Sequence, residues 1–279
     1  MKFAWLFLLF ALPALAGCAA ASAPEPPVPN GIVSTNPCAD AMLVELVPAG
    51  RITAISHYSH DPMATSIPLE QARQFRATRG TAEEMIALRP ALVIASSFTP
   101  PATREAYARA GLRTLYLDSP TTIEASKDQV RALAEAVGAQ AEGAKMIARI
   151  DAAVMRASRR DAPVPALLWI GGNLVSGGGT LLDEMMVRAG FVDQAAHYGL
   201  QHTGTLPAEH VVADPPRLML VPDEAGRDSA SRAAQTRRWA LAHSGVRQAR
   251  FPRNLMNCGG PVIAKAMDRL AEVRQAIAR

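Results

Sequence analysis

The sequence lacks any concentration of charge of one sign. Its 279 residues include 29 lysines and arginines and 25 aspartates and glutamates, which gives a formal net charge of +4. It contains no dense block of lysine and arginine and no basic stripe interleaved with aromatic residues. Such patterns are typical of proteins that bind nucleic acid. We therefore expect no nucleic-acid partner.

Motifs of enzyme catalysis are missing as well. The glycine-rich stretch "GGNLVSGGGTLLDE", residues 171–184, lacks the lysine and the serine or threonine that end a phosphate-binding loop. It also lacks the spacing of a dinucleotide fingerprint. Neither a G-x-S-x-G turn nor an H-E-x-x-H pair occurs. We therefore expect a protein that is not an enzyme, with no catalytic residue and no metal site of its own.

The N-terminal apolar run is too short for a comfortable transmembrane helix. Residues 3–18, "FAWLFLLFALPALAGC", are interrupted by proline and end in small residues, which is typical of an export signal. Residues 15–18, "LAGC", resemble the bacterial lipobox, in which the cysteine is acylated and becomes the mature N-terminus. This resemblance predicts a lipid anchor on Cys18. The alternative is an ordinary signal cleaved near Ala16 or Ala20.

Strand-like and helix-like segments alternate through the rest of the sequence, which indicates an α/β fold. Strands are expected within residues 50–56, 90–96, 111–118, 166–172, 217–223 and 249–256. Residues 122–160 contain few strand formers and predict a long helical region, broken mainly at Gly138 and Gly143. A final helix is expected over residues 261–279. Two Rossmann-like lobes joined by a long backbone helix are the simplest arrangement.

The expected divisions of the chain follow from these segments. The stretch "AAASAPEPPVP" carries one charge and has little with which to build a core, so it predicts a tether. The divisions are a lipoprotein signal peptide (1–18), an Ala/Pro-rich tether (19–33), an N-terminal α/β lobe (34–122), a helical linker (123–160) and a C-terminal α/β lobe (161–279).

One pattern occurs once in each expected lobe. "EEMIALRPALVIA" from Glu83 and "EHVVADPPRLMLV" from Glu209 both place a proline seven residues after the glutamate and an apolar strand after the proline. Each predicts a short helix with its glutamate near the N-terminus, where the helix dipole favours an anion, and with a proline that ends it. We expect a paired role for the two glutamates. Simple recurrence of αβ units is the alternative.

Four segments together resemble a known family. They are "GTAEEMIALRPALVIAS", "AGLRTLYLDSPTTIEASKDQVRALAEAVG", "LVSGGGTLLDEMMVRAGFVD" and "GGPVIAKAMDRLAEV". Their order and spacing resemble the periplasmic substrate-binding proteins for iron chelates and vitamin B12 that feed ABC importers. The resemblance implies ligand capture between two lobes. It also implies that one surface glutamate per lobe, here Glu83 and Glu209, docks on the transmembrane permease dimer.

The loop "SHYSHDP" carries the densest group of chemically active side chains. His57, Tyr58 and His60 follow a predicted strand, and ligands usually bind at the carboxyl ends of such strands. Tyr58 can stack on a flat macrocycle, and a histidine can offer a nitrogen to a metal. The alternative for the histidines is hydrogen bonding at the surface. The surrounding "AISHYSHDPMATSI" is similar to a loop of the vitamin B12-binding members, which favours cobalamin over haem or a ferric siderophore.

The resemblance places further candidates at the cleft. Ser176 and Gly177 are expected in a turn at its edge, and Trp169 and Asn257 are candidates from the second lobe. Trp169 alternates with apolar neighbours, so core packing is its alternative.

Cysteine is rare, and Cys38 and Cys258 remain once Cys18 is assigned to lipid. By resemblance both lie at or near the cleft. Three interpretations are open: a disulfide that ties the lobes, two thiolates offered to a soft ligand or metal, and two unrelated buried thiols. The disulfide is preferred because export favours oxidation.

These observations together predict a carrier. The expected protein is a monomeric, membrane-anchored lipoprotein on the periplasmic or extracytoplasmic face, which delivers a bulky metal chelate to an ABC permease. A different class remains open, namely an envelope sensor or accessory protein that keeps the fold without delivering cargo.

Overall fold

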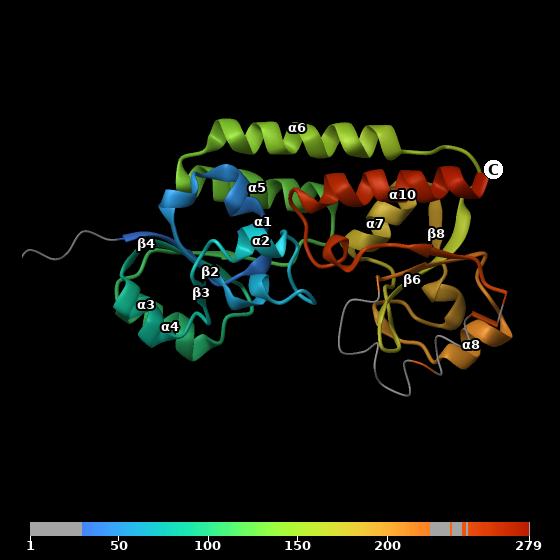
Figure 1. Ribbon diagram of the computed structural model, residues 1–279, viewed down its shortest axis with the longest axis horizontal. Helices are drawn as coiled ribbons and strands as arrows, with labels where there is room; N and C mark the ends of the chain where they lie inside the picture. The colour runs from blue at the N-terminus through green and yellow to red at the C-terminus, as the bar shows by residue number, and fades with distance from the viewer. Residues whose placement is uncertain (1–29, 224–234, 236–241, 244, 279) are drawn as a thin grey trace, which may run out of the picture.

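Two α/β lobes lie side by side beneath a layer of long helices (Figure 1). The computed structural model describes residues 30–223, 235, 242–243 and 245–278. The expected signal peptide, Cys18 and residues 19–29 of the expected tether lie outside these ranges. The predicted α/β class, with two lobes and a helical backbone, is confirmed.

The N-terminal lobe is built on a parallel sheet of five strands in the order β3-β2-β1-β4-β5. The strands are β1 Asn30–Ser34, β2 Ile52–Ser56, β3 Ala77–Thr78, β4 Pro90–Ser96 and β5 Thr114–Leu117. The helices that follow the first four are α1 Pro37–Leu46, α2 Leu69–Ala72, α3 Ala82–Leu88 and α4 Pro101–Arg109. Ile32 and Leu92 belong to one buried cluster, and Val33 and Val93 belong to another. Burial on both faces is why these strands are continuous apolar runs.

The expected tether is shorter than the sequence predicted. Residues 30–33 lie in β1, at the centre of the sheet, and Ile32 and Val33 are buried. The prediction that the tether continues to residue 33 is therefore wrong. The strand was missed because only two strongly apolar residues follow a proline-rich segment.

The helical layer consists of α5 Ile123–Val137, α6 Gln140–Ala157 and α10 Val262–Ala278. Helix α6 lies above α5 and α10 and extends over both lobes (Figure 1). Thr122 caps the start of α5, and Gly138 ends it in the left-handed conformation, with φ of 69°. None of the helices in the described ranges has the length and apolar character that a membrane crossing requires.

Gly143 does not break the helical region, contrary to the prediction. It is buried inside α6, where an added Cβ would lie 2.6 Å from the Cβ of Ala134 on α5. The absence of a side chain therefore permits the close approach of the two helices.

The C-terminal lobe is built on a sheet in the order β11-β10-β6-β7-β9, with β8 paired to β6. The strands are β6 Val164–Gly171, β7 Leu174–Val175, β8 Phe191–Asp193, β9 Gly204–Thr205, β10 Leu218–Val221 and β11 Gln248–Arg250. Helices α7 Leu181–Arg188 and α8 Ala208–Ala213 accompany them. The pairs of β6 with β10 and β8 are parallel, whereas the pairs of β7 with β6 and β9 are antiparallel.

The strand expected over residues 249–256 is much shorter. Strand β11 ends at Arg250, and the 3-10 helix η5 Arg253–Leu255 follows Pro252. Proline has no N–H to donate to a sheet, so a strand ends readily at this position.

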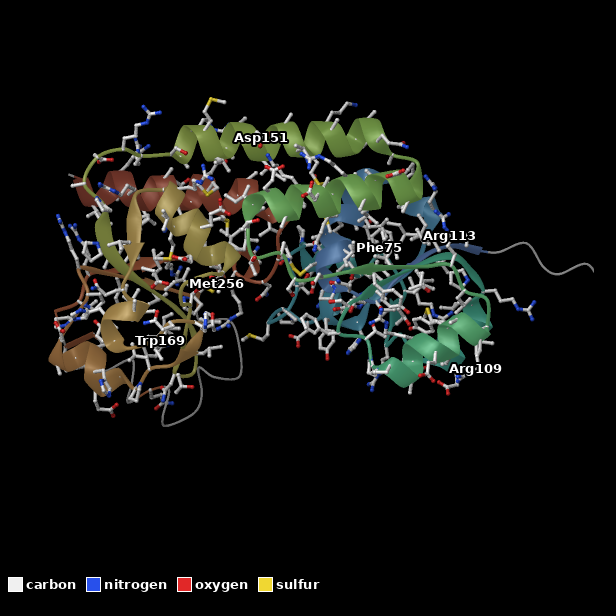
Figure 2. The ribbon with its side chains drawn as sticks, turned by 180° about the vertical axis from the view of Figure 1, so that it is seen from behind. Phe75, Arg109, Arg113, Asp151, Trp169 and Met256 are labelled. Carbon is white, nitrogen blue, oxygen red and sulfur yellow. A yellow bond between two sulfur atoms is a disulfide. The ribbon has the colours of Figure 1, made fainter. Side chains whose placement is uncertain are left out.

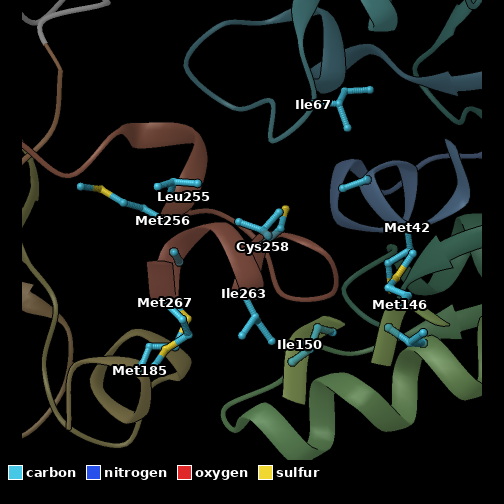
Figure 3. Packing of buried hydrophobic residues seen from close by; sticks show 14 of the residues in the cluster. Met42, Ile67, Met146, Ile150, Met185, Leu255, Met256, Cys258, Ile263 and Met267 are labelled. Carbon is cyan, nitrogen blue, oxygen red and sulfur yellow. The ribbon is translucent and has the colours of Figure 1, made fainter. Parts of the chain in front are cut away.

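One apolar core continues from the N-terminal lobe through the helical layer into the C-terminal lobe. Figure 3 shows Met42 of α1 and Met146 of α6 on one side of Cys258, with Met185 and Met267 on the other. All five residues belong to the same buried cluster. The two lobes are therefore joined by one close-packed core, which resists large changes in the angle between them.

Candidate functional site

The carboxyl edge of the N-terminal sheet faces the boundary between the lobes. Ser96 at the end of β4 and residues 118–120 after β5 line a cavity there, together with Asn36 and Cys38 after β1. The carboxyl ends of parallel strands meet at one edge, which is where open α/β sheets bind ligands. This edge is the N-terminal half of the candidate site.

The cavity has a volume of about 240 Å³ and is lined by both lobes. Its lining from the C-terminal lobe consists of Ser176, Thr180, Leu181, Leu182, Met185, Thr203, Met256, Asn257, Cys258 and Gly259. It therefore brings together Ser176, Asn257 and both cysteines from the predicted set. The other predicted ligand residues, His57, Tyr58, His60, Gly177 and Trp169, do not line it.

Tyr58 stands on the 3-10 turn η2 His57–His60, directly after β2. Its side chain is 52% exposed, and its ring centroid lies 4.1 Å from that of His57. The N–H of Tyr58 donates to the Ser56 hydroxyl at 3.3 Å, which caps the turn. His57 Nδ1 lies 3.3 Å from the carbonyl oxygen of Thr78. The turn therefore presents an aromatic face at the sheet edge while one histidine is engaged with β3.

His60 points inward rather than to solvent. Its Nε2 is buried and finds no hydrogen-bond partner within the part of the chain that the structure describes. Across the same residues, no group of three or more His, Cys, Asp or Glu side chains is arranged to hold a metal ion.

Phe98 is an aromatic candidate that sequence reasoning missed. It follows β4 in the stretch "SSFTP" and is 74% exposed. Its N–H donates to the hydroxyl of Ser96 at 3.1 Å, as the N–H of Tyr58 does to Ser56. Each aromatic stands two residues after a serine that ends a buried strand. This shared spacing is the signal that could have identified Phe98.

The segment after β5 supports the Phe98 loop. The Ser97 hydroxyl donates to Asp118 Oδ1 at 2.8 Å, and the same oxygen accepts the N–H of Ser119 at 2.9 Å. The Ser97 hydroxyl and the Ser119 N–H hold the pKa of Asp118 below its usual range. An ionised Asp118 therefore ties the ends of β4 and β5 together beside the cavity.

Trp169 lies inside the C-terminal lobe (Figure 2). It is 5% exposed in a cluster with Val175, Leu206 and Met219, and its Nε1 donates to the Gly172 carbonyl at 3.1 Å. Trp169 therefore does not line the cavity. This placement agrees with core packing, because the residue belongs to β6 itself and not to the loop beyond the strand.

The glycine turn after β7 is shaped by packing. Ser176 is buried, and its hydroxyl lies 3.2 Å from that of Thr180, the N-cap of α7. An added Cβ on Gly177 would lie 2.3 Å from the carbonyl carbon and oxygen of His202. Gly177 therefore allows the close approach of the segment that brings Thr203 to the cavity.

Asn257 bridges the lobes. Its Nδ2 donates to the carbonyl oxygen of Ala64 at 3.2 Å and lies 3.5 Å from that of Met63, both in the N-terminal lobe. Close by, the N–H of Gly260 donates to the hydroxyl of Ser126 on α5 at 2.7 Å. The segment before α10 is therefore fastened to the N-terminal lobe at several points.

Cys38 and Cys258 form a disulfide between the lobes, with their Cα atoms 5.1 Å apart. Cys38 lies in the first turn of α1, and Cys258 lies between the bridging Asn257 and α10. Of the three interpretations left open by the sequence, the structure shows the disulfide that ties the lobes. Because both cysteines line the cavity, the bond lies at the base of the candidate site.

Glu83 and Glu209 occupy equivalent positions on two short helices. Each is the second residue of its helix, α3 or α8, and each is exposed. A hydrogen bond from its own backbone N–H and one from the Thr81 hydroxyl lower the pKa of Glu83. Three residues later each helix exposes an aliphatic side chain, Ile86 or Val212. The predicted pair of short helices with N-terminal glutamates is confirmed.

Comparison with known proteins supports the architecture. The sequence matches the family described as periplasmic binding protein over residues 32–241. A periplasmic haem-binding protein from Roseiflexus sp. RS-1 in apo form is similar in structure, with a TM-score of 0.67 and 22% identity over 90% of this chain and 100% of that chain. No curated protein matches the chain.

Two further solved structures show the same fold. A periplasmic haem-binding protein from Pseudomonas aeruginosa gives a TM-score of 0.70 and 21% identity over 88% of this chain and 92% of that chain. The periplasmic vitamin B12-binding protein of Vibrio cholerae gives a TM-score of 0.66 and 17% identity over 90% of this chain and 98% of that chain. Because the family match covers residues 32–241, which is well over half of the sequence, this chain belongs to the periplasmic binding proteins.

Proposed function

We propose that the protein binds a metal-carrying tetrapyrrole between its lobes and delivers it to an ABC permease. The observation that carries the proposal is the pair of exposed aromatic side chains, Tyr58 and Phe98, on the edge of the N-terminal sheet. Both follow strands that end at the boundary between the lobes. Flat aromatic faces stack favourably on a flat macrocycle.

The family and the cavity fit this role. Members of the periplasmic binding protein family are solute-binding proteins and not enzymes, as the sequence predicts, and membership implies a periplasmic location. Small-molecule sites usually enclose about 300–1,000 Å³. The cavity of about 240 Å³ is smaller than that, so a tetrapyrrole would extend beyond it into the space between the two lobes.

Cobalamin is the first candidate, with haem and a ferric siderophore as the alternatives. The loop from Ala54 to Ile67 favours cobalamin by resemblance. The similar haem- and vitamin B12-binding structures support the tetrapyrrole class as a whole. The protein supplies packing faces and hydrogen bonds, and the metal arrives as part of the cargo.

Delivery rests on Glu83 and Glu209. Their equivalent positions, exposure and aliphatic neighbours support docking on arginines of a permease dimer. Replacing either glutamate with arginine should leave ligand affinity unchanged and impair uptake by cells. Loss of affinity would contradict the assignment. Unchanged affinity combined with uptake that does not depend on the gene would point to a sensor or accessory protein.

The N-terminus would hold the carrier at the membrane. We propose that Cys18 carries the lipid and that residues 19–29 form the tether to the folded lobes. Mass spectrometry of the mature N-terminus should find an acylated cysteine. An unmodified alanine or serine there would replace this proposal with a freely diffusing carrier.

The function is tested by equilibrium titration of the purified full chain with cyanocobalamin, hemin and a panel of ferric siderophores. We expect saturable one-to-one binding of cyanocobalamin or hemin. Tyr58→Ala should weaken it by about tenfold to a hundredfold, since full burial of a large apolar side chain contributes about 1.5–3 kcal/mol.

Met155→Ala is the matched control, because Met155 is 75% exposed on α6, outside the candidate site. It should leave the affinity unchanged. Binding of siderophores alone would keep the carrier role and exclude the tetrapyrrole. Binding of no probe would contradict the proposed function.

A further inference from the structure

A buried carboxylate lies behind the turn that presents Tyr58. Asp40 is in the first turn of α1, two residues after the disulfide-bonded Cys38, and is fully buried. A buried ionised carboxylate is costly unless its oxygens are hydrogen-bonded or paired. The contacts that Asp40 makes therefore indicate what the residue is for.

One oxygen of Asp40 holds both sides of the turn. Oδ2 accepts the N–H of Ser56 at 2.9 Å and the hydroxyl of Ser59 at 2.6 Å. Ser56 in turn accepts the N–H of Tyr58 through its hydroxyl. The two serines flank His57 and Tyr58 in the sequence. Fixing both serines on a single oxygen therefore fixes the path of the backbone between them.

The other oxygen, Oδ1, is buried and has no hydrogen-bond partner among the residues that the structure describes. Hydrogen bonds to a charged group are stronger than those between neutral groups, and a buried oxygen without a partner opposes that gain. A neutral residue at this position would avoid the penalty of burial but would lose the ionic acceptor. The arrangement thus favours control of the turn over the stability of the lobe.

We propose that Asp40 is a positioning residue for the ligand site. It holds the turn from Ser56 to Ser59 so that Tyr58 stands at the carboxyl edge of the N-terminal sheet. This inference rests on the proposed function for its meaning. Asp40 does not touch the expected ligand and acts through the two serines. The first turn of α1 carries both Asp40 and Cys38, and Cys38 is bonded to Cys258 of the C-terminal lobe. The segment from Ser56 to Ser59 is therefore also held in position relative to the C-terminal lobe.

The clamp should respond to pH near neutrality. Burial raises the pKa of Asp40 to about 7, against the lowering effect of the nearby Ser34 hydroxyl and of the hydrogen bonds from Ser59 and the Ser56 backbone. Above that pH the ionised carboxylate accepts both donors strongly. Below it the carboxyl group is neutral and its hydrogen bonds are weaker. For opening of the turn alone, with Asp40 still buried, the turn should therefore be held more firmly at pH 8 than at pH 6, although ionisation lowers the stability of the fold as a whole.

No charged group packed around Asp40 in the described part of the chain accounts for the shift in its pKa. Strands β1 and β2 carry no charged residue, and η2 carries His57 and His60. Charged side chains on α1, α5 and α6 are mostly engaged in ion pairs: Glu45–Arg149, Glu124–Lys127, Glu124–Arg131, Asp128–Arg131, Lys127–Asp151, Glu142–Lys145 and Arg156–Asp268. Within the described residues, no charged neighbour contributes to the shift of Asp40.

Hydrogen exchange of the ligand-free full chain, followed by mass spectrometry over residues 56–59, tests the clamp. In the wild type the protection factor should fall by about tenfold between pH 8 and pH 6. Asp40→Asn should show the lower value at both pH values. Asp193→Asn, which neutralises a half-buried carboxylate of the other lobe, should behave as the wild type. Ser59→Ala should lose part of the protection at pH 8.

The ligand arm uses hemin and cyanocobalamin as probes, and Asp40→Asn should weaken whichever of them binds by about tenfold. Protection in Asp40→Asn equal to that of the wild type at pH 8 would overturn the inference. If Asp40→Asn does not fold, Ser59→Ala decides, because protection of residues 56–59 equal to that of the wild type at pH 8 also overturns it. If neither probe binds, the proposed function fails, and the exchange data still decide whether Asp40 holds the turn.

Discussion

The two lobes offer different surfaces to the cleft although both contain a parallel core of strands. The N-terminal lobe exposes two aromatic side chains at its sheet edge, Tyr58 and Phe98. In the C-terminal lobe Trp169 is buried, and the edge combines a glycine turn, polar groups and the aliphatic side chains of Leu181, Leu182, Met185 and Met256. One lobe supplies flat aromatic faces, whereas the other supplies backbone, polar and flexible aliphatic groups.

The difference follows from where each aromatic stands relative to its strand. Trp169 lies within β6, whose side chains pack against neighbouring elements on both faces of the sheet. Tyr58 and Phe98 lie two residues beyond a strand, in turns capped by serine hydroxyls. On a sheet covered on both faces, only residues past the strand end can reach a cleft.

The largest expected effect breaks the connection between the lobes. Cys38→Ser with Cys258→Ser should lower the free energy of unfolding by about 5 kcal/mol, because the disulfide closes a loop of 220 residues. Denaturant unfolding of the variant and of the oxidised wild type measures this difference. A change below about 1 kcal/mol would show that the shared apolar core alone holds the lobes together.

The next effect concerns the aromatic side chain of the C-terminal lobe. Trp169→Ala should lower the free energy of unfolding by about 3–5 kcal/mol, since it empties a packed cluster. Variants that remain folded should bind ligand with unchanged affinity. Loss of affinity with normal stability would place Trp169 in the site and remove the contrast between the lobes.

The two lobes should also differ in how Asp40, which is buried, and Asp193, which is half-buried, respond to pH. Burial raises the pKa of Asp40 to about 7 and that of Asp193 to about 6. Between the ordinary aspartate value of 3.8 and these values, the folded state binds more protons than the unfolded state. Stability therefore falls as pH rises through each window, and the loss is complete above it.

Replacing each carboxylate with its amide separates these contributions. In the wild type, Asp40 should lower the free energy of unfolding by about 2–4 kcal/mol as the pH rises to 7, and Asp40→Asn should remove this decrease. Asp193→Asn should remove a smaller decrease that ends near pH 6. Denaturant unfolding between about pH 4 and pH 8 measures both slopes. Slopes that are identical in the wild type and both variants would mean that neither group titrates in this range.

The smallest expected change in the free energy of unfolding concerns Phe98, at the carboxyl edge of the N-terminal sheet. Phe98→Ala should leave the free energy of unfolding within about 0.5 kcal/mol of the wild type, because the ring is exposed. It should weaken ligand binding by about tenfold, if stacking buries much of the ring. Titration beside Met155→Ala measures it. Equal affinities of the two variants would remove Phe98 from the site.

Much of the fold could be predicted because local signals agree with the tertiary structure. The run "PALVIAS" coincides with β4, and Thr122 and Gly138 delimit α5 as cap residues do. Strand β1 was missed since its two apolar residues gain their partners only in the sheet. Gly143 was misjudged because its neighbour Ala134 lies on another helix.

The site was predicted less completely than the fold. The cysteine pair and Asn257 were placed correctly at the lobe boundary, since export and family order constrain them. The bridging role of Asn257, the burial of Trp169 and the exposure of Phe98 depend on which elements pack over each strand. Sequence spacing cannot supply that information for a single chain.

We propose that cargo lies against Tyr58 and Phe98 of the N-terminal lobe. Hydrogen exchange of the full chain with and without saturating cyanocobalamin or hemin tests this placement. We expect added protection in residues 57–60, 97–99 and 118–120, with residues around Trp169 unchanged. Protection confined to the C-terminal lobe, or spread over the outer face of α6, would contradict it.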